Sequence, residues 1–452
     1  MNSLIELINR FAGSREWWSS GLAARMRTGV ALNLVGAAFN QGSTLVVNIV
    51  VANLLGRQAF GEYTMVLATV STLATLGQLS MGYTATKHVA EFRSSDPDRA
   101  SRIMGLCAVL STAAAGIVAL ALALPAEWLA DTVLKAPHLA TELRVAAGAV
   151  FCLIIVGFGT GSLAGLEGYS ALARAGVASG TLYAMVCSGL AWGYGLRGAI
   201  AGVAVSALLQ AVILGVLLVR EASRQGIFIS RRRLWQERAI VFNFAVPASL
   251  TGFVTLPALW IASALLARQP GGYHQLALFG AANSFRTMVL FLPQTINNVG
   301  MSLLNNQRRS TDQAFRRVFW MNATLTTVTA AGGAVAILLA GSPLLRLFGG
   351  TFVEGRLVLM ILLVPAIIEA VALALYQIIV SRGRMWTSLL QVSLPRDGAI
   401  VLFAAALTPA FGAAGLATSY ALGWVLGLAG IVAIVSRLGL SAAPDPAVVS
   451  AR

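Results

Sequence analysis

Four charged side chains lie well inside long apolar stretches of the sequence, and their types limit the chemistry they can do. They are Arg286, Glu369, Arg396 and Asp397. A charge at membrane depth costs roughly 2.5 to 3.5 kcal/mol on insertion scales, so each must face protein or water. An arginine there can bind an anionic group, and a carboxylate can exchange a proton or Na⁺. Alternatively, the arginines form buried ion pairs with the carboxylates and only fix the helix register.

Polar side chains also form stripes along two of the apolar stretches. At about 100° per residue, one set in the first stretch falls within an arc of about 100°: Asn33, Asn40, Gln41, Thr44 and Asn48. A set in the eighth stretch falls within about 120°: Asn283, Arg286, Thr287, Gln294, Asn297 and Asn298. Amides facing lipid would be left unpaired, so the stripes must line a wet cavity or pair with each other across a helix interface. We favour the cavity, which makes these residues candidates for binding a polar ligand.

The elements that carry these residues are predicted to be membrane-spanning helices. Of the 452 residues, 57% are hydrophobic and 11% are charged, whereas soluble domains have roughly a quarter charged. Runs of about 20 apolar residues, enough to cross about 30 Å of hydrocarbon, predict an all-α polytopic membrane protein of about 12 transmembrane helices. We place the spans at 30–55, 62–86, 103–124, 143–165, 175–193, 199–219, 241–266, 276–304, 318–340, 357–380, 388–408 and 413–436.

The two halves of the chain echo each other. The segment LLGRQAFGEY at 54–63 returns as LLARQPGGY at 265–273, with four identical residues at an offset of 211. A second echo pairs GAIAGVAVS at 198–206 with GAAGLATS at 412–419, which aligns Gly202 with Gly415 at an offset of 213. Duplicated halves in a membrane chain are typical of transporters whose site lies between the repeats. The sequence therefore predicts two six-helix bundles.

Basic residues predict the orientation and the boundaries of the bundles. With the N-terminus in the cytoplasm, most of the 32 Lys and Arg fall on the cytoplasmic side, including the cluster at 231–233. We expect a cytoplasmic N-terminal segment at 1–29, bundles at 30–219 and 241–436, a basic cytoplasmic linker at 220–240 and a cytoplasmic tail at 437–452. The net charge of +15 is then an orientation signal and a contact for anionic lipids, so no nucleic acid is needed to explain it.

Other chemistry has little support. The three cysteines lie within apolar spans without CxxC spacing, and the three histidines are scattered, so we expect no metal and no disulfide. The longest external loop, 125–142, offers Glu127, Asp131 and Glu142 without a partnering motif, so we expect no enzyme. Glycines at 157, 159, 161 and 165 are predicted to be helix-packing surfaces. Pro395 should bend or break the eleventh span beside Arg396 and Asp397.

The segments LLGRQAFGEYTMV at 54–66 and LGQLSMGYTATKHVAEF at 76–92 resemble the polysaccharide transporter family of the multidrug/oligosaccharidyl-lipid/polysaccharide exporter superfamily. The resemblance runs from about residue 30 to 435. It implies two six-helix bundles around a central cavity in the inner (plasma) membrane, and flipping of an undecaprenyl-pyrophosphate-linked oligosaccharide to the outer leaflet for O-antigen, capsule or exopolysaccharide biosynthesis. A polysaccharide polymerase and a chain-length regulator are expected partners. The family's cationic cavity implies roles for Arg286 and Arg396, with Lys87.

On this basis Arg286 is expected to contact the pyrophosphate, and Asn33, Asn40, Asn48 and Gln294 to bond sugar hydroxyls. Moving two negative charges outward gains about 4.6 kcal/mol per 100 mV, at roughly 2.3 kcal/mol per charge, so the potential can set the direction. Coupling to H⁺ or Na⁺ through Asp397 or Glu369 is the alternative drive, and no other cofactor is expected. The alternative function is an ion-coupled multidrug exporter of the same fold, for which Glu369 and Asp397 would stand alone in the cavity.

Overall fold

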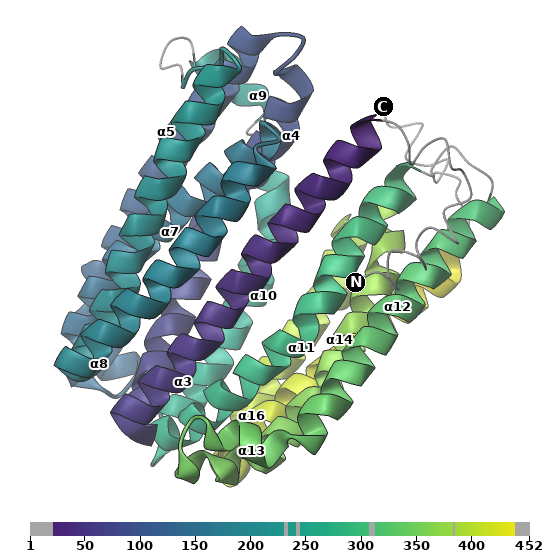
Figure 1. Cartoon of the computed structure of the whole chain (residues 1–452). Helices are drawn as coiled ribbons and strands as arrows, with labels where there is room; N and C mark the ends of the chain where they lie inside the picture. Colours follow the sequence, from purple (N-terminus) through teal and green to yellow (C-terminus); the bar gives the residue numbers. More distant parts are fainter. Residues whose placement is uncertain (1–20, 230–233, 241–244, 307–311, 383–384, 439–452) are drawn as a thin grey trace.

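The chain folds into two bundles of helices. The computed structural model describes residues 21–229, 234–240, 245–306, 312–382 and 385–438, and within these ranges the chain is helical with no β-strand. The N-terminal bundle is drawn purple to teal and the C-terminal bundle green to yellow (Figure 1). The prediction of an all-α polytopic membrane protein is confirmed. Most of the predicted terminal segments 1–29 and 437–452 lies outside the described residues.

Three helices are far too long for a single crossing of a membrane. They are α3 (Gly21–Gly77), α8 (Tyr169–Arg224) and α16 (Leu394–Leu438), with 57, 56 and 45 residues. At 1.5 Å per residue, α3 alone would be about 85 Å long, whereas the hydrocarbon core is about 30 Å thick. Each contains a glycine with non-helical backbone angles at which the chain reverses. Each long helix therefore supplies two spans, and the end of the molecule where they reverse is called the reversal end below.

The reversals follow the sequence repeat. Gly56, Gly195 and Gly412 have φ of 73°, 61° and 54°, a left-handed conformation that glycine adopts without steric cost. After the second and third reversals, Gly198 packs against the backbone of Leu190 and Gly415 against that of Leu407. These pairs match at an offset of 217, so the alignment of Gly202 with Gly415 at 213 was wrong by four residues. The corrected register places equivalent glycines at equivalent turns.

The other elements complete the two bundles. The N-terminal bundle adds α4 (Met81–Phe92), α5 (Pro97–Ala123), α6 (Ala126–Trp128), η1 (Leu129–Val133), η2 (Pro137–Leu139) and α7 (Ala140–Gly165). The connection between the bundles carries η3 (Leu234–Glu237) and α9 (Arg238–Ile240). The C-terminal bundle consists of α10 (Val246–Ala267), α11 (Gly272–Asn306), α12 (Asp312–Leu339), α13 (Gly341–Arg346), η6 (Gly350–Gly355), α14 (Arg356–Ser381), α15 (Met385–Ser388), η7 (Leu389–Ser393) and α16. Each arm of the three kinked helices counts as one span, and the second arm of α3 counts together with α4. On this count the described elements supply about 12 crossings, as the sequence predicted.

The second span is interrupted where the sequence predicted one continuous helix. Between α3 and α4, Leu79 and Ser80 have backbone φ angles of 44° and 54°. Residues other than glycine rarely adopt positive φ angles. A Cβ on Gly82 would press on the carbonyl of Gly157, and one on Gly161 would collide with the backbone of Gly82. The chain therefore leaves the helical path beside a contact at which two backbones touch. This contact confirms that Gly157 and Gly161 are packing residues.

A similar disturbance precedes Pro395. The five residues of η7 form a π-helical turn that leads directly into α16, whose second residue is Pro395. A wider turn accommodates a residue that has no N–H and clashes with the preceding turn. The expected local break beside Arg396 therefore takes the form of a π turn rather than a separation of two helices.

The apolar core shows how the bundles meet. One cluster of buried residues spans both bundles at the reversal end and includes Phe60 of α3, Phe285 of α11 and Phe348 after α13. Toward the opposite end, which carries the linker and is called the linker end below, the buried residues form separate clusters. One surrounds Met104 in the N-terminal bundle and another surrounds Ile431 in the C-terminal bundle. The described residues thus share a core at one end only, and the ribbons diverge toward the other (Figure 1).

Candidate functional site

The contact between the bundles at the reversal end combines an ion pair with packed aromatic rings. Arg57 Nη1 lies 2.8 Å from Glu354 Oε2, and Asn53 Nδ2 donates to the carbonyl of Leu347. The ring of Phe60 packs against those of Phe348 and Phe352, with centroids 5.9 and 5.7 Å apart. Tilted and edge-on aromatic pairs of this kind contribute about 0.5 to 1.5 kcal/mol beyond area burial. These contacts clasp the two bundles at this end.

Farther along α3, the polar stripes of the first and eighth spans meet each other. Gln41 Nε2 donates to Thr287 Oγ1 at 3.3 Å, and Asn48 Nδ2 donates to Ser284 Oγ at 3.2 Å. These two bonds define the α3–α11 seam. The sequence allowed the polar stripes either to line a wet cavity or to pair with each other across a helix interface. In this conformation Gln41 and Asn48 pair across the helix interface. Ser284 was missed, because a serine in an apolar helix more often bonds its own backbone, as Ser284 also does here.

Arg286 points away from the seam and into its own bundle. Its Nη1 lies 2.6 Å from Glu369 Oε2 on α14 and 2.9 Å from the hydroxyl of Tyr420 on α16. Its Nε donates to Asn283 Oδ1 one turn back on α11. Arg286 is only 9% exposed, and its guanidinium lies over the Tyr420 ring with 4.7 Å between the guanidinium carbon and the centroid. This geometry is the buried ion pair that the sequence offered as the alternative to direct ligand contact.

A second group of amides lies inside the C-terminal bundle. Gln377 Nε2 donates to both the side-chain and backbone oxygens of Asn297, at 2.6 and 2.7 Å. Asn322 Nδ2 donates to Asn297 Oδ1 and Gln377 Oε1, both at 3.3 Å. Asn322 and Gln377 are each 4% exposed. The predicted polar face of the eighth span is therefore divided, with Thr287 turned to α3 and Asn283, Arg286 and Asn297 turned to the interior of their own bundle.

The other charged pair predicted from the sequence also forms. Arg396 binds the neighbouring Asp397 through two bonds, Nε to Oδ1 at 2.7 Å and Nη2 to Oδ2 at 3.1 Å. The guanidinium lies 4.5 Å above the ring of Trp424 in the returning arm of α16, and Asp397 is 2% exposed. A Cβ on Gly427 would touch the Arg396 stem, so a small residue makes room for this side chain. Both carboxylates predicted to exchange an ion are thus matched by an arginine.

Two candidates remain exposed beside the seam. Asn40 on α3 and Gln294 on α11 are both exposed, which leaves them accessible to a ligand. The side chains of Asn33 and Asn298 lie outside the described residues. The described residues contain no cluster of three metal-binding side chains.

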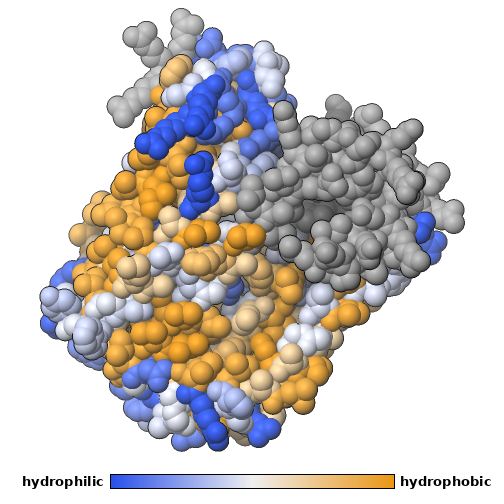
Figure 2. Space-filling view, viewed as in Figure 1, coloured by the Kyte–Doolittle hydropathy of each residue, from blue (hydrophilic) through white to orange (hydrophobic). Residues whose placement is uncertain are grey.

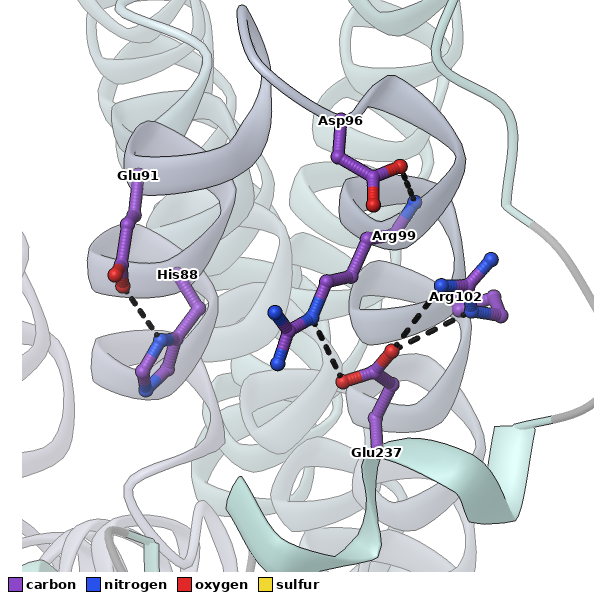
Figure 3. A network of polar contacts seen from close by, with 6 residues as sticks. All are labelled: His88, Glu91, Asp96, Arg99, Arg102 and Glu237. Atoms are coloured by element: carbon purple, nitrogen blue, oxygen red, sulfur yellow. Dashed lines mark hydrogen bonds and ion pairs between the residues drawn. The ribbon is translucent and has the colours of Figure 1, made fainter.

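At the linker end, a polar network joins the connection between the bundles to α5. Figure 3 shows Arg99 and Arg102 converging on Glu237 of η3, while His88 and Glu91 pair on α4. Burial of the imidazole lowers the pKa of His88 from its ordinary value of 6.5, and the hydrogen bond to Glu91 only partly opposes this. Glu237 and its two arginines were not singled out from the sequence, because the residues lie 135 to 138 positions apart.

Comparison with known proteins assigns the fold and the family. Residues 26–304, more than half of the chain, match the family described as "Polysaccharide biosynthesis protein". The chain belongs to this family. A relative from Ralstonia nicotianae, "EPS I polysaccharide export inner membrane protein EpsE", is 27% identical over 369 residues, which cover 78% of this chain and 81% of the relative.

Solved structures share the fold at low sequence identity. The structure "Lipid II flippase MurJ, inward closed conformation" matches with a TM-score of 0.70 and 10% identity, over 90% of this chain and 87% of that one. An inward-facing multidrug resistance MATE family transporter matches with a TM-score of 0.67 and 15% identity, over 90% and 98%. Both solved structures are of membrane transporters, and this chain shares their fold. The expectation that the chain is not an enzyme agrees with the family and the fold.

Proposed function

We propose that this member of the polysaccharide biosynthesis family flips an undecaprenyl-pyrophosphate-linked oligosaccharide from the cytoplasmic to the outer leaflet of the inner (plasma) membrane by alternating access. The polymer it serves would be an O-antigen, capsule or exopolysaccharide, made with a polysaccharide polymerase and a chain-length regulator. One observation carries the proposal: the bundles are clasped at the reversal end through Arg57, Glu354 and Phe60 but have separate cores at the linker end. The basic residues of the linker favour a cytoplasmic location for the linker end, and this supports the proposed direction. On this orientation the proposal takes the present conformation as the one that faces the cytoplasm.

The α3–α11 seam is the proposed path of the oligosaccharide. Its two hydrogen bonds, Gln41 to Thr287 and Asn48 to Ser284, join neutral side chains, and a typical bond of this kind stabilises by about 0.5 to 1.5 kcal/mol. Sugar hydroxyls can replace such bonds at little net cost. The exposed Asn40 and Gln294 extend the same polar surface. The prenyl chain would stay in lipid beside the seam while the sugars pass between the bundles.

The membrane potential is the proposed drive. Glu369 is paired with Arg286, and Asp397 with Arg396, so each carboxylate already has a fixed cation beside it. A carboxylate in such a pair gives up its arginine only at a large cost, which makes it a poor site for cyclic exchange of H⁺ or Na⁺. The same pairing weighs against the alternative of an ion-coupled multidrug exporter, because neither carboxylate stands alone. Arg286 and Arg396 then hold helices together rather than bind the pyrophosphate directly.

A reversible cross-link at the reversal end tests the proposal. Cysteines replacing Arg57 and Glu354 would be joined in cells with a short thiol-cleavable cross-linker, because Cys107, Cys152 and Cys187 are buried and compete little. We expect the cross-link to abolish surface polymer and to leave lipid-linked oligosaccharide inaccessible to a lectin added outside spheroplasts. Reductant should restore both readouts, and either single variant treated with the reagent should behave as untreated. Continued polymer production by the cross-linked protein would rule out alternating access at this end.

A further inference from the structure

The connection between the bundles is docked firmly on the N-terminal bundle. Residues 225–229 and 234–240 are called the docked linker here. Gln225 Nε2 donates to the carbonyl of Leu166 at 2.9 Å, and the backbone N–H of Phe228 donates to Ser101 Oγ at 3.1 Å. Ile227 is completely buried in the apolar cluster of the N-terminal bundle. The linker therefore has a defined orientation on this bundle.

Glu237 fixes the second part of the docked linker. Its two carboxylate oxygens lie 3.2 Å from Arg99 Nε and 3.3 Å from Arg102 Nη2, as Figure 3 shows, and the side chain is only 8% exposed. Arg99 also lies over the ring of Phe92, 4.2 Å from the guanidinium carbon to the centroid. Because the inward face of η3 is fixed by this clamp, the fold also determines which side chains face outward.

Large apolar side chains of the docked linker are exposed, both before η3 and within it. Phe228 is 64% exposed, Ile229 39% and Trp235 68%. A 3₁₀ helix has three residues per turn, so Trp235 and Glu237 project about 120° apart, and a carboxylate turned to α5 leaves the indole turned away. Exposed large apolar side chains within so short a connection indicate a partner that covers them.

The charges around this face identify the partner. Arg220, Arg224 and Arg238 are exposed on the same connection, and Arg224 is only loosely matched by Glu221 at 3.5 Å. Aromatic rings beside exposed arginines suit the layer where anionic lipid phosphates meet the acyl chains. The docked linker continues directly from the last turn of α8, so it leaves the membrane at this level. Figure 2 shows hydrophilic residues gathered at the end of the N-terminal bundle above a broad hydrophobic belt.

We infer that the docked linker is an interfacial anchor: Phe228, Ile229 and Trp235 insert at the acyl boundary of the leaflet at the linker end, and Arg220, Arg224 and Arg238 bind anionic phospholipid phosphates. The N-terminal bundle is then tethered to this leaflet through Glu237. This role does not depend on the cargo that the protein carries.

Depth-dependent fluorescence quenching tests the anchor. The full chain would be reconstituted in phosphatidylglycerol-containing vesicles whose lipids carry bromine either near the headgroup or near the chain end. Subtracting the emission of Trp235→Phe from that of the unaltered protein isolates one of the nine tryptophans. We expect this component to be quenched more strongly by bromine near the headgroup. The matched control is Trp260→Phe. The indole N–H of Trp260 donates to Thr69 between the bundles, so the emission isolated by this second subtraction should not be quenched.

The basic residues are tested in the same vesicles. A triple variant would carry glutamine in place of Arg220, Arg224 and Arg238. In phosphatidylglycerol vesicles, the quenching of Trp235 in this variant should fall to the level found in phosphatidylcholine vesicles. Trp235 emission that is red and unquenched would show that the indole faces water. Emission that is blue and unquenched would show that protein covers it. Either result overturns the inference, and a circular-dichroism melt of each variant verifies that it is folded.

Discussion

Arg286 of α11 and Glu369 of α14 form an ion pair of 2.6 Å in the interior of the C-terminal bundle. The hydroxyl of Tyr420 on α16 contacts both partners, at 2.9 and 3.2 Å, so three helices meet at one charge-neutral group. Two charges that would each be costly in the membrane thus enter it as a pair. The pair explains how the second half of the chain tolerates these two charges.

Removing one partner of this pair should destabilise the protein strongly. Arg286→Met leaves Glu369 buried without its cation, and breaking a buried pair in this way costs about 3 to 5 kcal/mol. We expect a lower midpoint of thermal unfolding in detergent and reduced levels of the protein in the membrane. Replacing both residues, as Arg286→Met with Glu369→Leu, should recover most of the loss, because no unpaired charge remains.

The double variant also separates the two roles of Arg286. If Arg286 acts through the pair, the stable double variant should support surface polymer at close to the normal level. If it binds the pyrophosphate, as the sequence first suggested, the double variant would be stable and yet produce no polymer. Membrane levels of the protein, measured by immunoblotting, serve as the control for both comparisons.

The seam should be sensitive to loss of its amides. Asn48→Ala removes the donor to Ser284, and Gln41→Ala removes the donor to Thr287. Each change should cost about 1 kcal/mol at the contact and reduce polymer output more than it reduces protein level, because the same amides are proposed to bond sugar hydroxyls. Thr44→Ala is the matched control, since Thr44 bonds only the carbonyl of Asn40 within its own helix among the described contacts. Equal effects of Thr44→Ala and Asn48→Ala would argue against a role for the seam.

A single methyl group at Gly61 should force the clasped end apart. A Cβ there would collide with the backbone carbonyl of Tyr273 in the other bundle, whereas a Cβ on Gly42 of the same helix meets nothing within 4 Å. Gly61→Ala should therefore cost about 1 to 3 kcal/mol and reduce surface polymer. Gly42→Ala should be neutral or slightly stabilising, because alanine favours a helix over glycine by up to about 1 kcal/mol. Normal surface polymer from the Gly61→Ala protein would show that the two backbones separate easily.

Much of the fold follows from local sequence. Apolar runs give the spans. Gly195 lies three residues before one of the repeated segments, and Gly412 is the first residue of the other. The break at Leu79 and Ser80 was not predicted, because neither residue type signals a left-handed backbone. The break lies beside a contact with α7, more than 70 positions away, at which Gly82 meets Gly157. Contacts at that separation leave no periodic signal in one sequence.

The candidate site shows the same limit. Helical periodicity identified the polar faces of the first and eighth spans, but it does not say which helix each residue of a face will meet. Thr287 contacts α3, whereas Arg286, one position before it, contacts α14. The partners Asn322, Gln377 and Tyr420 were missed because the sequence does not show which polar residue of an apolar span faces another helix. Together they bond the predicted residues from three different helices.

His88 should make the stability of the linker end depend on pH. Burial lowers its pKa, so the folded protein favours the neutral imidazole, and nearby Lys87 and Arg99 act in the same direction while Glu91 opposes them. As the pH falls below 6.5, the unfolded chain takes up a proton that the folded chain resists, so the free energy of unfolding decreases. We expect His88→Gln to flatten the dependence of the thermal midpoint on pH between about 7 and 5. An unchanged pH profile would assign that dependence to other groups.

The clamp on Glu237 should control local opening of the linker. Glu237→Gln removes the carboxylate that pairs with Arg99 and Arg102, whose side chains are 40% and 26% exposed. Loss of these ion pairs should cost about 1 to 2 kcal/mol, a value between those for exposed and for buried pairs. Amide hydrogen exchange in the docked linker should then accelerate by about 5- to 30-fold. Glu127→Gln is the matched control, because Glu127 pairs with the exposed Arg144 and neither residue belongs to the docked linker. Exchange that is unchanged in Glu237→Gln would show that Ile227 and Ser101 hold the linker without the clamp.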